Sequence, residues 1–220
     1  MQNKDQKAPP RRGRPPKGTE DESLERILDA AAASFLEAGY AATSVDGVTA
    51  AAGVSKTTFY GRFESKAALF AEVARRWIGR GAEIPELGEA DDSAAVRDRL
   101  HAIALSMLGT ALKPEVIAFD RIISAETVRF PELARIHKGF RTVHGARAIE
   151  DCLRAGVERG ELALDDIGFA ADFFLTVAIR GPLRKAVLSV ENAGLSPKHR
   201  RDLQKTIELF LNGARKREAT

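Results

Sequence analysis

Cysteine, methionine, tryptophan and tyrosine are scarce in this 220-residue chain, which holds one, two, one and two of them. A single cysteine, Cys152, excludes a disulfide within the chain and a zinc site built from several thiolates. We interpret Cys152 as a small residue of a core or an interface. A redox sensor is the sharper alternative, and it would require a thiol from another chain.

Long apolar runs are also lacking. No stretch approaches the roughly 20 apolar residues that cross a bilayer, and the N-terminal segment is polar and proline-rich instead of carrying the apolar core of a signal peptide. Hydrophobic residues make up 44% of the chain and charged residues 30%, a composition typical of globular proteins. We therefore predict a cytoplasmic protein with no membrane partner.

The motifs of common enzymes are missing as well. The chain has no Walker loop, dinucleotide fingerprint or nucleophile elbow, and its four histidines form no H-E-x-x-H pair. His137 and His144 share a helical face, but no carboxylate follows either of them on that face, so we interpret both as surface or pocket-edge side chains. The sequence predicts no catalytic site, no metal and no cofactor.

Positive charge gathers in the first 18 residues. The net charge of the chain is +3, yet this tail holds six cations against Asp5, a balance of +5 that leaves −2 for the remainder. Its prolines and glycines predict disorder over residues 1–18. The run RRGRPPK, with Arg12 and Arg14, resembles an AT-hook that enters the minor groove of A·T-rich DNA. The alternative is a basic tail that adds only sequence-independent affinity.

Residues 43–70 predict two short helices joined by a tight turn, with a third helix directly after them. Gly53 suits the left-handed end of the first helix, and Ser55 suits the N-cap of the second, which we expect over residues 56–62. The second helix is anchored by Phe59 and leaves polar and cationic groups on its other faces. Such a surface suits the phosphates and base edges of a major groove.

The side chains expected to contact DNA carry hydroxyl groups or positive charge. Lys66 is among them because it lies beside the free amides at the start of the third helix, an arrangement that suits a phosphate. The full set is Thr43, Ser44, Ser55, Lys56, Thr57, Thr58, Tyr60, Arg62 and Lys66, with Arg12 and Arg14 of the tail.

The run TSVDGVTAAAGVSKTTFYGRFESKAALF resembles the DNA-binding domain of the TetR family of bacterial transcriptional regulators. The shared pattern is A-G-V-S-K-x-T-F-Y, then F-x-S-K and an apolar pair. Gly61 departs from it, because many relatives carry a larger residue there, which puts a contact often made from that position in doubt. The resemblance implies an all-α fold, with a three-helix helix-turn-helix domain over residues 19–78 and a helical ligand-binding and dimerisation domain over 90–217.

The rest of the chain predicts helices and no strand. Glycine, proline and acidic residues between 79 and 93 break the helical pattern and mark a domain boundary. Beyond them, apolar residues recur at helical spacing, with kinks expected near Gly139 and Gly145 and at Gly181-Pro182. The expected helices cover residues 94–112, 114–129, 131–160, 165–190 and 197 onwards.

The last two helices carry more apolar surface than one buried face needs, which indicates a partner helix pair. The family resemblance implies the same, since the last two helices of TetR regulators form a four-helix dimer interface. A monomer that keeps those stripes in its own core is the alternative. The expected interface residues are Phe173, Val177, Leu203, Ile207, Phe210 and Leu211.

The middle helices supply candidates for an effector cavity with apolar walls and a few polar groups at its edge. The run AETVRFPELAR also resembles the C-terminal half of one large branch of TetR regulators. An ordinary packed core is the alternative for each candidate. The candidates are Met107, Phe119, Ile123, Phe140, Val143, His144, Arg147 and Phe174.

We therefore expect a homodimeric, nucleoid-associated repressor that binds a palindromic operator and is released by a small, largely apolar ligand. The ligand can shift the equilibrium only by its differential affinity for the two states. The alternative is a DNA-binding regulator without an inducer, either architectural or controlled by a protein partner. An enzyme that happens to carry a helix-turn-helix would need convergent titratable groups, and the sequence shows none.

Overall fold

The structure, a computed structural model, describes residues 17–79, 95–142 and 145–214. Every regular element in these ranges is a helix and none is a β-strand, so the predicted all-α class is confirmed. The first four helices are α1 (Lys17–Ala42), α2 (Val45–Ala52), α3 (Lys56–Tyr60) and α4 (Lys66–Gly79). The others are α5 (Val96–Ala111), α6 (Pro114–Glu126), α7 (Pro131–Thr142), α8 (Gly145–Glu158), α9 (Ile167–Leu175), the π-helix η1 (Thr176–Arg180), α10 (Gly181–Val187) and α11 (Pro197–Ala214).

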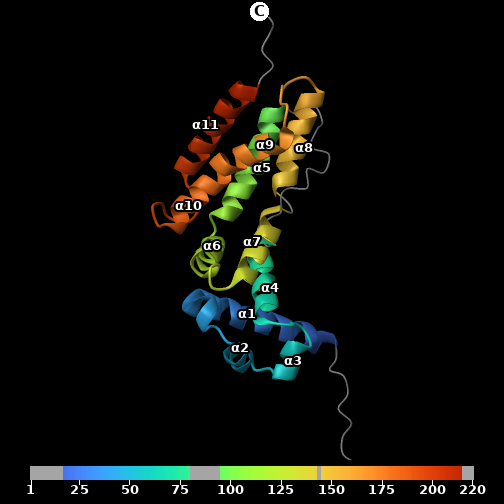
Figure 1. The fold of residues 1–220 in the computed structure, drawn as a ribbon, viewed down its shortest axis with the longest axis vertical. Coiled ribbons are helices and arrows are strands. Elements are labelled where there is room, and N and C mark those ends of the chain that lie inside the picture. Colours follow the sequence, from blue (N-terminus) through green and yellow to red (C-terminus); the bar gives the residue numbers. More distant parts are fainter. Residues whose placement is uncertain (1–16, 80–94, 143–144, 215–220) are drawn as a thin grey trace, which may run out of the picture.

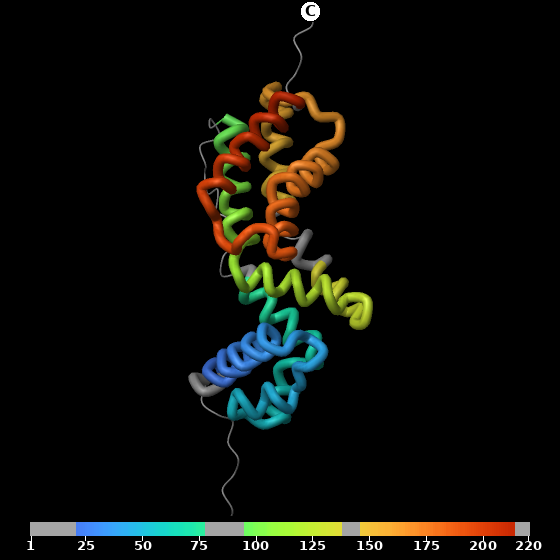
Figure 2. Tube along the Cα trace, turned by 90° about the vertical axis from the view of Figure 1, so that its left-hand side faces the viewer, coloured from blue at the N-terminus to red at the C-terminus, as the bar shows by residue number. Residues whose placement is uncertain are grey.

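The helices form an elongated molecule with α1, α2 and α3 at one end and α8, α9 and α11 towards the other (Figures 1 and 2). Helix α4 leads away from the N-terminal group and contacts α6 and α7 in the middle of the molecule. Helix α6 also contacts α1. The N-terminal helices are therefore joined to the rest of the protein by packed helices, in addition to the chain itself.

Two clusters of buried apolar side chains hold the helices together. The first lies among α1, α2, α3 and α4, and it also takes in Phe119 and Ile123 of α6 and Leu133 of α7. Phe70 of α4 and Phe119 stack with ring centroids 5.4 Å apart. The N-terminal core therefore extends beyond residues 19–78, the bounds expected from the sequence.

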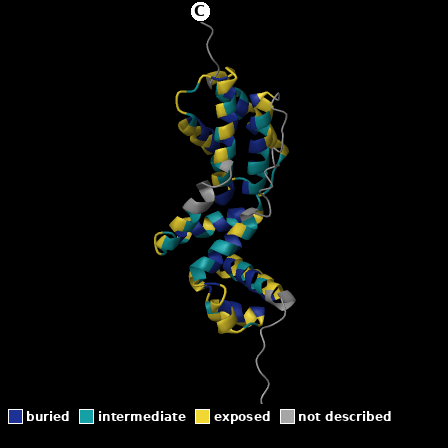
Figure 3. Cartoon of the chain, turned by 90° about the vertical axis from the view of Figure 1, so that its right-hand side faces the viewer, coloured by how far each residue is buried: buried dark blue, intermediate teal, exposed yellow. Residues whose placement is uncertain are grey.

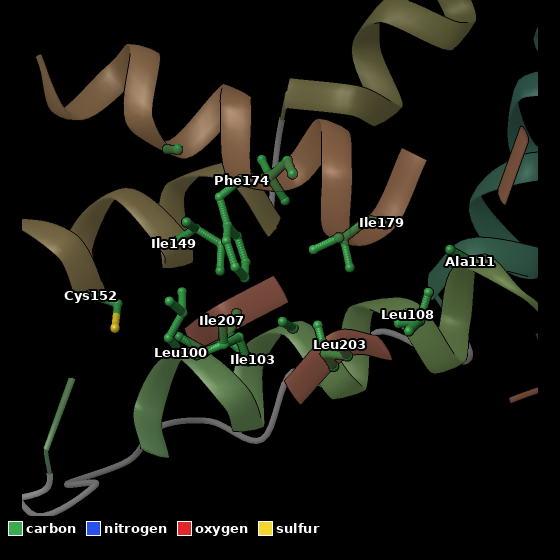
Figure 4. Packing of buried hydrophobic residues seen from close by; sticks show 14 of the residues in the cluster. Leu100, Ile103, Leu108, Ala111, Ile149, Cys152, Phe174, Ile179, Leu203 and Ile207 are labelled. Carbon is green, nitrogen blue, oxygen red and sulfur yellow. The ribbon is translucent and has the colours of Figure 1, made fainter. Parts of the chain in front are cut away.

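The second cluster surrounds α5 and is completed by α8, α9, η1, α10 and α11. Figure 4 shows Phe174 of α9 pointing towards Leu100 and Ile103 of α5, with Ile207 of α11 nearby. Burial of several such side chains, at about 1.5–3 kcal/mol each, supplies the main stabilisation of this half.

Local sequence explains where the short helices begin and end. Gly39 has φ 78° and ψ 178°, so it breaks the regular course of α1 three residues before its end. Gly53 has φ 64° and ends α2 in the left-handed conformation that its lack of a Cβ permits. Ser55 caps α3, with its hydroxyl oxygen accepting a hydrogen bond from the Thr58 amide at 3.0 Å. The predictions made for Gly53 and Ser55 from the sequence agree with the structure.

The kink expected at Gly181-Pro182 takes the form of a π-helix. Pro182 has no N–H to donate, and the Gly181 amide bonds to the Thr176 carbonyl five residues earlier. Arg180 donates to the Thr176 hydroxyl and to Asp172, both at 2.8 Å. The expected helix over residues 131–160 is two helices, α7 and α8. The expected break between 79 and 93 lies, apart from Gly79 at the end of α4, outside the described residues.

Within the described ranges no single helix has the length and apolar character to span a membrane. Helices α5 and α6, taken together, meet that test by length and composition, with a 69° bend between them.

Candidate nucleic-acid interface

Helices α2 and α3 form a compact pair whose inner side is apolar. Phe59 of α3 is fully buried beside Val48 and Ala52 of α2, and its ring packs against Phe63 at 5.5 Å. The turn between the helices is closed by a hydrogen bond from the Val54 amide to the Thr49 carbonyl, 3.1 Å long. Because one side of α3 is anchored in this way, its remaining faces are held in a fixed orientation towards solvent.

The exposed faces of this pair carry most of the side chains that the sequence predicted to contact DNA. Figure 3 shows this end of the molecule largely in the colour of exposed residues. Tyr60 is 56% exposed, with its ring edge-on to Phe59 at 5.2 Å. The predicted residues that are exposed here are Ser44, Ser55, Lys56, Thr57, Thr58, Tyr60 and Arg62.

Several hydroxyl groups on this surface also hold the helix ends. The Ser44 hydroxyl caps α2 by accepting from the Gly47 amide at 3.0 Å. The hydroxyls of Ser55 and Thr58 are hydrogen-bonded to each other at 2.9 Å. A serine hydroxyl that accepts from a backbone amide keeps its own O–H, which can still donate to a phosphate oxygen. Ser44 and Ser55 therefore bring backbone and hydroxyl groups to the surface rather than cationic ones.

The Lys56 ammonium is paired with Asp46 in the first turn of α2, at 2.9 Å from Oδ1. Both side chains are well exposed, and the hydrogen bond to Asp46 raises the pKa of Lys56. The sequence analysis did not single out Asp46. The sequence hints at the contact only by placing an acidic residue at the start of one helix and a lysine at the start of the next. These positions indicate a contact only when the geometry of the turn between the two helices is known.

Two predicted DNA contacts have other roles in the structure. Thr43 is 2% exposed, and its hydroxyl donates to the Gly39 carbonyl at 2.8 Å. The Lys66 ammonium donates to the carbonyls of Tyr40 and Thr43 at 2.7 and 2.9 Å, and it lies 4.4 Å from the centre of the Tyr40 ring. Burial lowers the pKa of Lys66. Both side chains thus hold the end of α1 and the link to α2. Thr43 is buried, whereas Lys66 is partly buried, and the predicted DNA contact of each stays a prediction.

Arg12 and Arg14 lie outside the described residues, and so does the AT-hook-like run. Their proposed contact with a minor groove remains a prediction.

The chain matches two family models. Residues 27–73 match the bacterial regulatory proteins of the tetR family, and residues 98–213 match the C-terminal domain of AefR-like transcriptional repressors. The second match alone covers more than half of the chain. The chain belongs to the TetR family. It is a transcriptional regulator with a helix-turn-helix DNA-binding domain, as the sequence predicted.

Solved structures agree with this assignment. This TetR-family chain is 30% identical to the Flavonoid-responsive Regulator FrrA. The match covers 90% of this chain and 100% of FrrA, and the two structures superpose with a TM-score of 0.70. A TetR-family regulator from Pseudomonas syringae pv. tomato is 26% identical, with coverage of 87% of this chain and 96% of that one and a TM-score of 0.69. None of the curated proteins compared with the chain matches it.

The effector-cavity candidates of this TetR-family protein lie in different parts of the structure. Phe119 and Ile123 are buried in the N-terminal core, whereas Phe174 is buried in the C-terminal core and Met107 packs against it. Arg147 is exposed and lies 3.9 Å from Asp151. The side chains of Phe140, Val143 and His144 lie outside the described residues. The assignment of the candidates to one effector cavity stays a prediction.

The predicted dimer residues also divide into two groups. Leu203, Ile207 and Leu211 are buried in the protomer's own core, which is the alternative that the sequence left open for them. Phe210 is partly buried, with its ring 5.1 Å from that of Phe174.

The other two predicted dimer residues, Phe173 and Val177, are exposed. Phe173 is 53% exposed and stacks on Phe169, which is 70% exposed, with ring centroids 6.5 Å apart. On α11, Leu209 is 76% exposed beside an open hollow of about 460 Å³ that it lines with Gln204, Lys205 and Glu208. Phe169 and Leu209 were not among the surface residues predicted from the sequence, although Phe169, Phe173 and Val177 recur every four residues and so lie along one side of a helix.

Proposed function

We propose that this TetR-family regulator is a homodimeric repressor that reads a palindromic operator with α3 of each subunit. The observation that carries the proposal is the exposed row of hydroxyl and cationic groups on α3, held by the buried ring of Phe59. In a helix-turn-helix the second helix enters the major groove and its first residues face the bases, so Lys56 and Thr57 are positioned for base edges. Tyr60 and Arg62 are suited to phosphates.

The remaining predicted contacts take supporting roles in this proposal. Ser44, Ser55 and Thr58 present hydroxyl groups at the two helix ends nearest to the reading surface. Thr43 and Lys66 position the pair by holding the α1–α2 link. Arg12 and Arg14 extend the contact into an adjacent minor groove, in keeping with the positive charge of the tail. Such a protein works in the cytoplasm, associated with the nucleoid.

Dimerisation is supported by the exposed apolar side chains of α9, η1 and α11. Phe169, Phe173, Val177 and Leu209 place large apolar groups in solvent on helices whose other faces are already packed. Covering such groups with a second copy removes apolar area from water, which favours association. A two-fold dimer then presents two α3 helices to major grooves about 34 Å apart, the repeat of a palindromic site.

Release by a small apolar ligand is supported by the kinship with FrrA, whose name describes it as flavonoid-responsive. The C-terminal core around Met107 and Phe174 is the apolar environment available to a ligand of that kind. A ligand there displaces α5 and α6, and α6 is tied to the α1–α2 link by the carboxylate of Glu126. A change in the position of α6 is thereby transmitted to the reading helices.

One observation favours the alternative of a regulator without an inducer. The cavity candidates are divided between two packed cores, with Phe119 and Phe174 each no more than 2% exposed. A protein with no space for a ligand would be controlled by a partner protein or by its own concentration.

The test measures binding of the full chain to its own promoter region by fluorescence anisotropy, with and without a planar flavonoid such as apigenin. Tight, salt-dependent binding that the Lys56→Ala plus Tyr60→Phe variant loses supports the operator contact. Unchanged binding by that variant contradicts it. Loss of the wild-type complex on addition of apigenin supports release by a ligand, whereas a complex that a panel of apolar compounds leaves intact favours the regulator without an inducer.

A further inference from the structure

An acidic and a basic side chain lie together on the surface that is proposed to face DNA. Asp46 belongs to the first turn of α2, Lys56 is the first residue of α3, and the ammonium lies 2.9 Å from the carboxylate oxygen Oδ1. The side chains are 71% and 60% exposed, so neither is committed to the core. The pair is thus free to exchange its internal contact for contacts with another molecule.

A carboxylate on a surface that faces DNA weakens binding unless a hydrogen-bond donor of the DNA faces it. Placed beside phosphates, it is repelled, and it also withdraws the charge of Lys56 from them. Base edges differ from phosphates because they offer donors as well as acceptors in the major groove. A surface that places Asp46 next to Lys56 is therefore better matched to a base pair than to a backbone.

Every base pair places an acceptor beside an amino donor in the major groove, and a G·C pair adds a second acceptor, guanine N7, next to O6. Guanine presents O6 and N7 as two acceptors for an ammonium, and the paired cytosine presents its N4 amino group as a donor to a carboxylate. Guanine O6 and cytosine N4 are themselves hydrogen-bonded, about 2.9 Å apart, because they pair with each other. Two neighbouring side chains, such as Lys56 and Asp46 with their charged groups 2.9 Å apart in the free protein, can therefore reach both groups at once. An A·T pair gives the ammonium a poorer partner and brings the thymine methyl against charged groups.

We propose that Asp46 and Lys56 act together as a reader of one G·C base pair in each half of the operator. Lys56 donates to guanine, and Asp46 accepts from the N4 amino group of the paired cytosine. The two side chains leave each other as they bind, so the ion pair of the free protein is replaced by two hydrogen bonds to the bases. The inference rests on the proposed binding of DNA by α3, and it adds a specificity residue that lies on α2.

The experiment selects binding sites from a random duplex library with the full-length wild-type protein, and then with D46N, K56Q and the double variant. The wild-type sites are expected to contain a G·C pair at one fixed position per half-site. Replacing that pair by A·T should weaken wild-type binding by roughly 5- to 150-fold, the range for a good base contact. Both single variants should lose most of this preference at the same position, and the double variant should lose little more than either one.

The matched control is Asp151→Asn, which removes an exposed carboxylate that is also paired with a cation, Arg154 at 2.9 Å, but lies on α8. It makes the same change in net charge and should leave the base preference intact. If D46N binds all DNA more tightly with the wild-type preference unchanged, Asp46 only repels phosphates and the proposal is overturned. If the selected sites have no such G·C position, it is overturned as well. A wild-type protein that selects no DNA at all would refute the proposed function instead.

Discussion

The carboxylate of Glu126 accepts a hydrogen bond from the backbone amide of Tyr40 at 2.8 Å, although the two residues are 86 positions apart in the sequence. The same oxygen accepts from the amide of Ala41 at 3.1 Å. On the other side of this backbone segment, Lys66 binds the carbonyls of Tyr40 and Thr43. The end of α1 and the start of its link to α2 are thus held by an anion from α6, which binds amides, and by a cation from α4, which binds carbonyls.

Replacing Glu126 by Ala should destabilise the N-terminal core by about 1.5 to 3 kcal/mol, the usual range for hydrogen bonds to a charged group. Trp77 is the only tryptophan and packs against this core, so its fluorescence during urea unfolding reports the change. Ser124→Ala, at an exposed position of the same helix, is the control and should leave the midpoint unchanged. An E126A midpoint equal to that of the wild type would show that the cross-domain hydrogen bonds contribute nothing.

Replacing Lys66 by Met should lower stability without changing the salt dependence of DNA binding. The ammonium is engaged by carbonyls of the protein, so its loss leaves buried acceptors without a donor, at about 1–3 kcal/mol. Arg62→Met should do the opposite, since Arg62 is an exposed cation proposed to contact a phosphate, and such a contact releases counterions when DNA binds. It should flatten the plot of log affinity against log salt by about 1 per subunit. A K66M variant of normal stability whose plot is flattened would restore Lys66 as a phosphate contact.

The phenol of Tyr40 should make the protein unstable in strong alkali. Burial, followed by the charge and hydrogen bond of Glu132, raises the pKa of Tyr40 above its usual value near 10. At pH values between its unfolded and folded pKa the phenol keeps its proton only in the folded state. The contribution of Tyr40 to the free energy of unfolding is therefore fully present below about pH 10 and decreases as the pH rises further.

The measurement exploits the fact that the chain has two tyrosines, Tyr40 and Tyr60. In a Tyr60→Phe variant the ultraviolet absorbance of tyrosinate comes from Tyr40 alone. We expect it to appear together with unfolding, above pH 10, and a further Tyr40→Phe change should make the loss of stability with pH shallower. Ionisation of Tyr40 at its ordinary pH in a folded Y60F variant would show that this phenol is not protected.

Charge on the exposed face of α9 should dissociate the dimer. Phe169→Asp plus Phe173→Asp places two carboxylates where the proposed subunit contact buries two stacked rings, and sedimentation should show a monomer. Leu188→Asp is the control, because Leu188 is 57% exposed but lies after α10, outside the proposed contact. The circular dichroism of both variants should remain helical. Dissociation by L188D, with F169D/F173D still dimeric, would place the interface elsewhere.

The reading surface was predictable because its signals are local. Gly53 and Ser55 determine the turn and the cap within a few residues, and Phe59 anchors α3 to its neighbour, so the exposed faces of Lys56, Thr57 and Tyr60 follow directly. The protein partners of Lys66 were not predictable, because the carbonyl and ring of Tyr40 lie 26 residues earlier and α4 approaches them only in the folded protein. Thr43 bonds to Gly39 only four residues before it, but its burial depends on how the helices pack. A polar residue near a DNA-binding helix has the same sequence signal whether it faces DNA or binds the backbone.

The sequence by itself determined the helical class, the helix-turn-helix and the family, since caps, turns and apolar periodicity act over one or two helical turns. Only the tertiary structure decided which apolar side chains are shared between helices and which remain in solvent. Leu203 and Phe173 have equally apolar side chains on amphipathic helices, yet one is buried in the core and the other is exposed. The difference arises because burial depends on which helices pack together, and the rotation of each helix about its own axis is set by all of its neighbours at once.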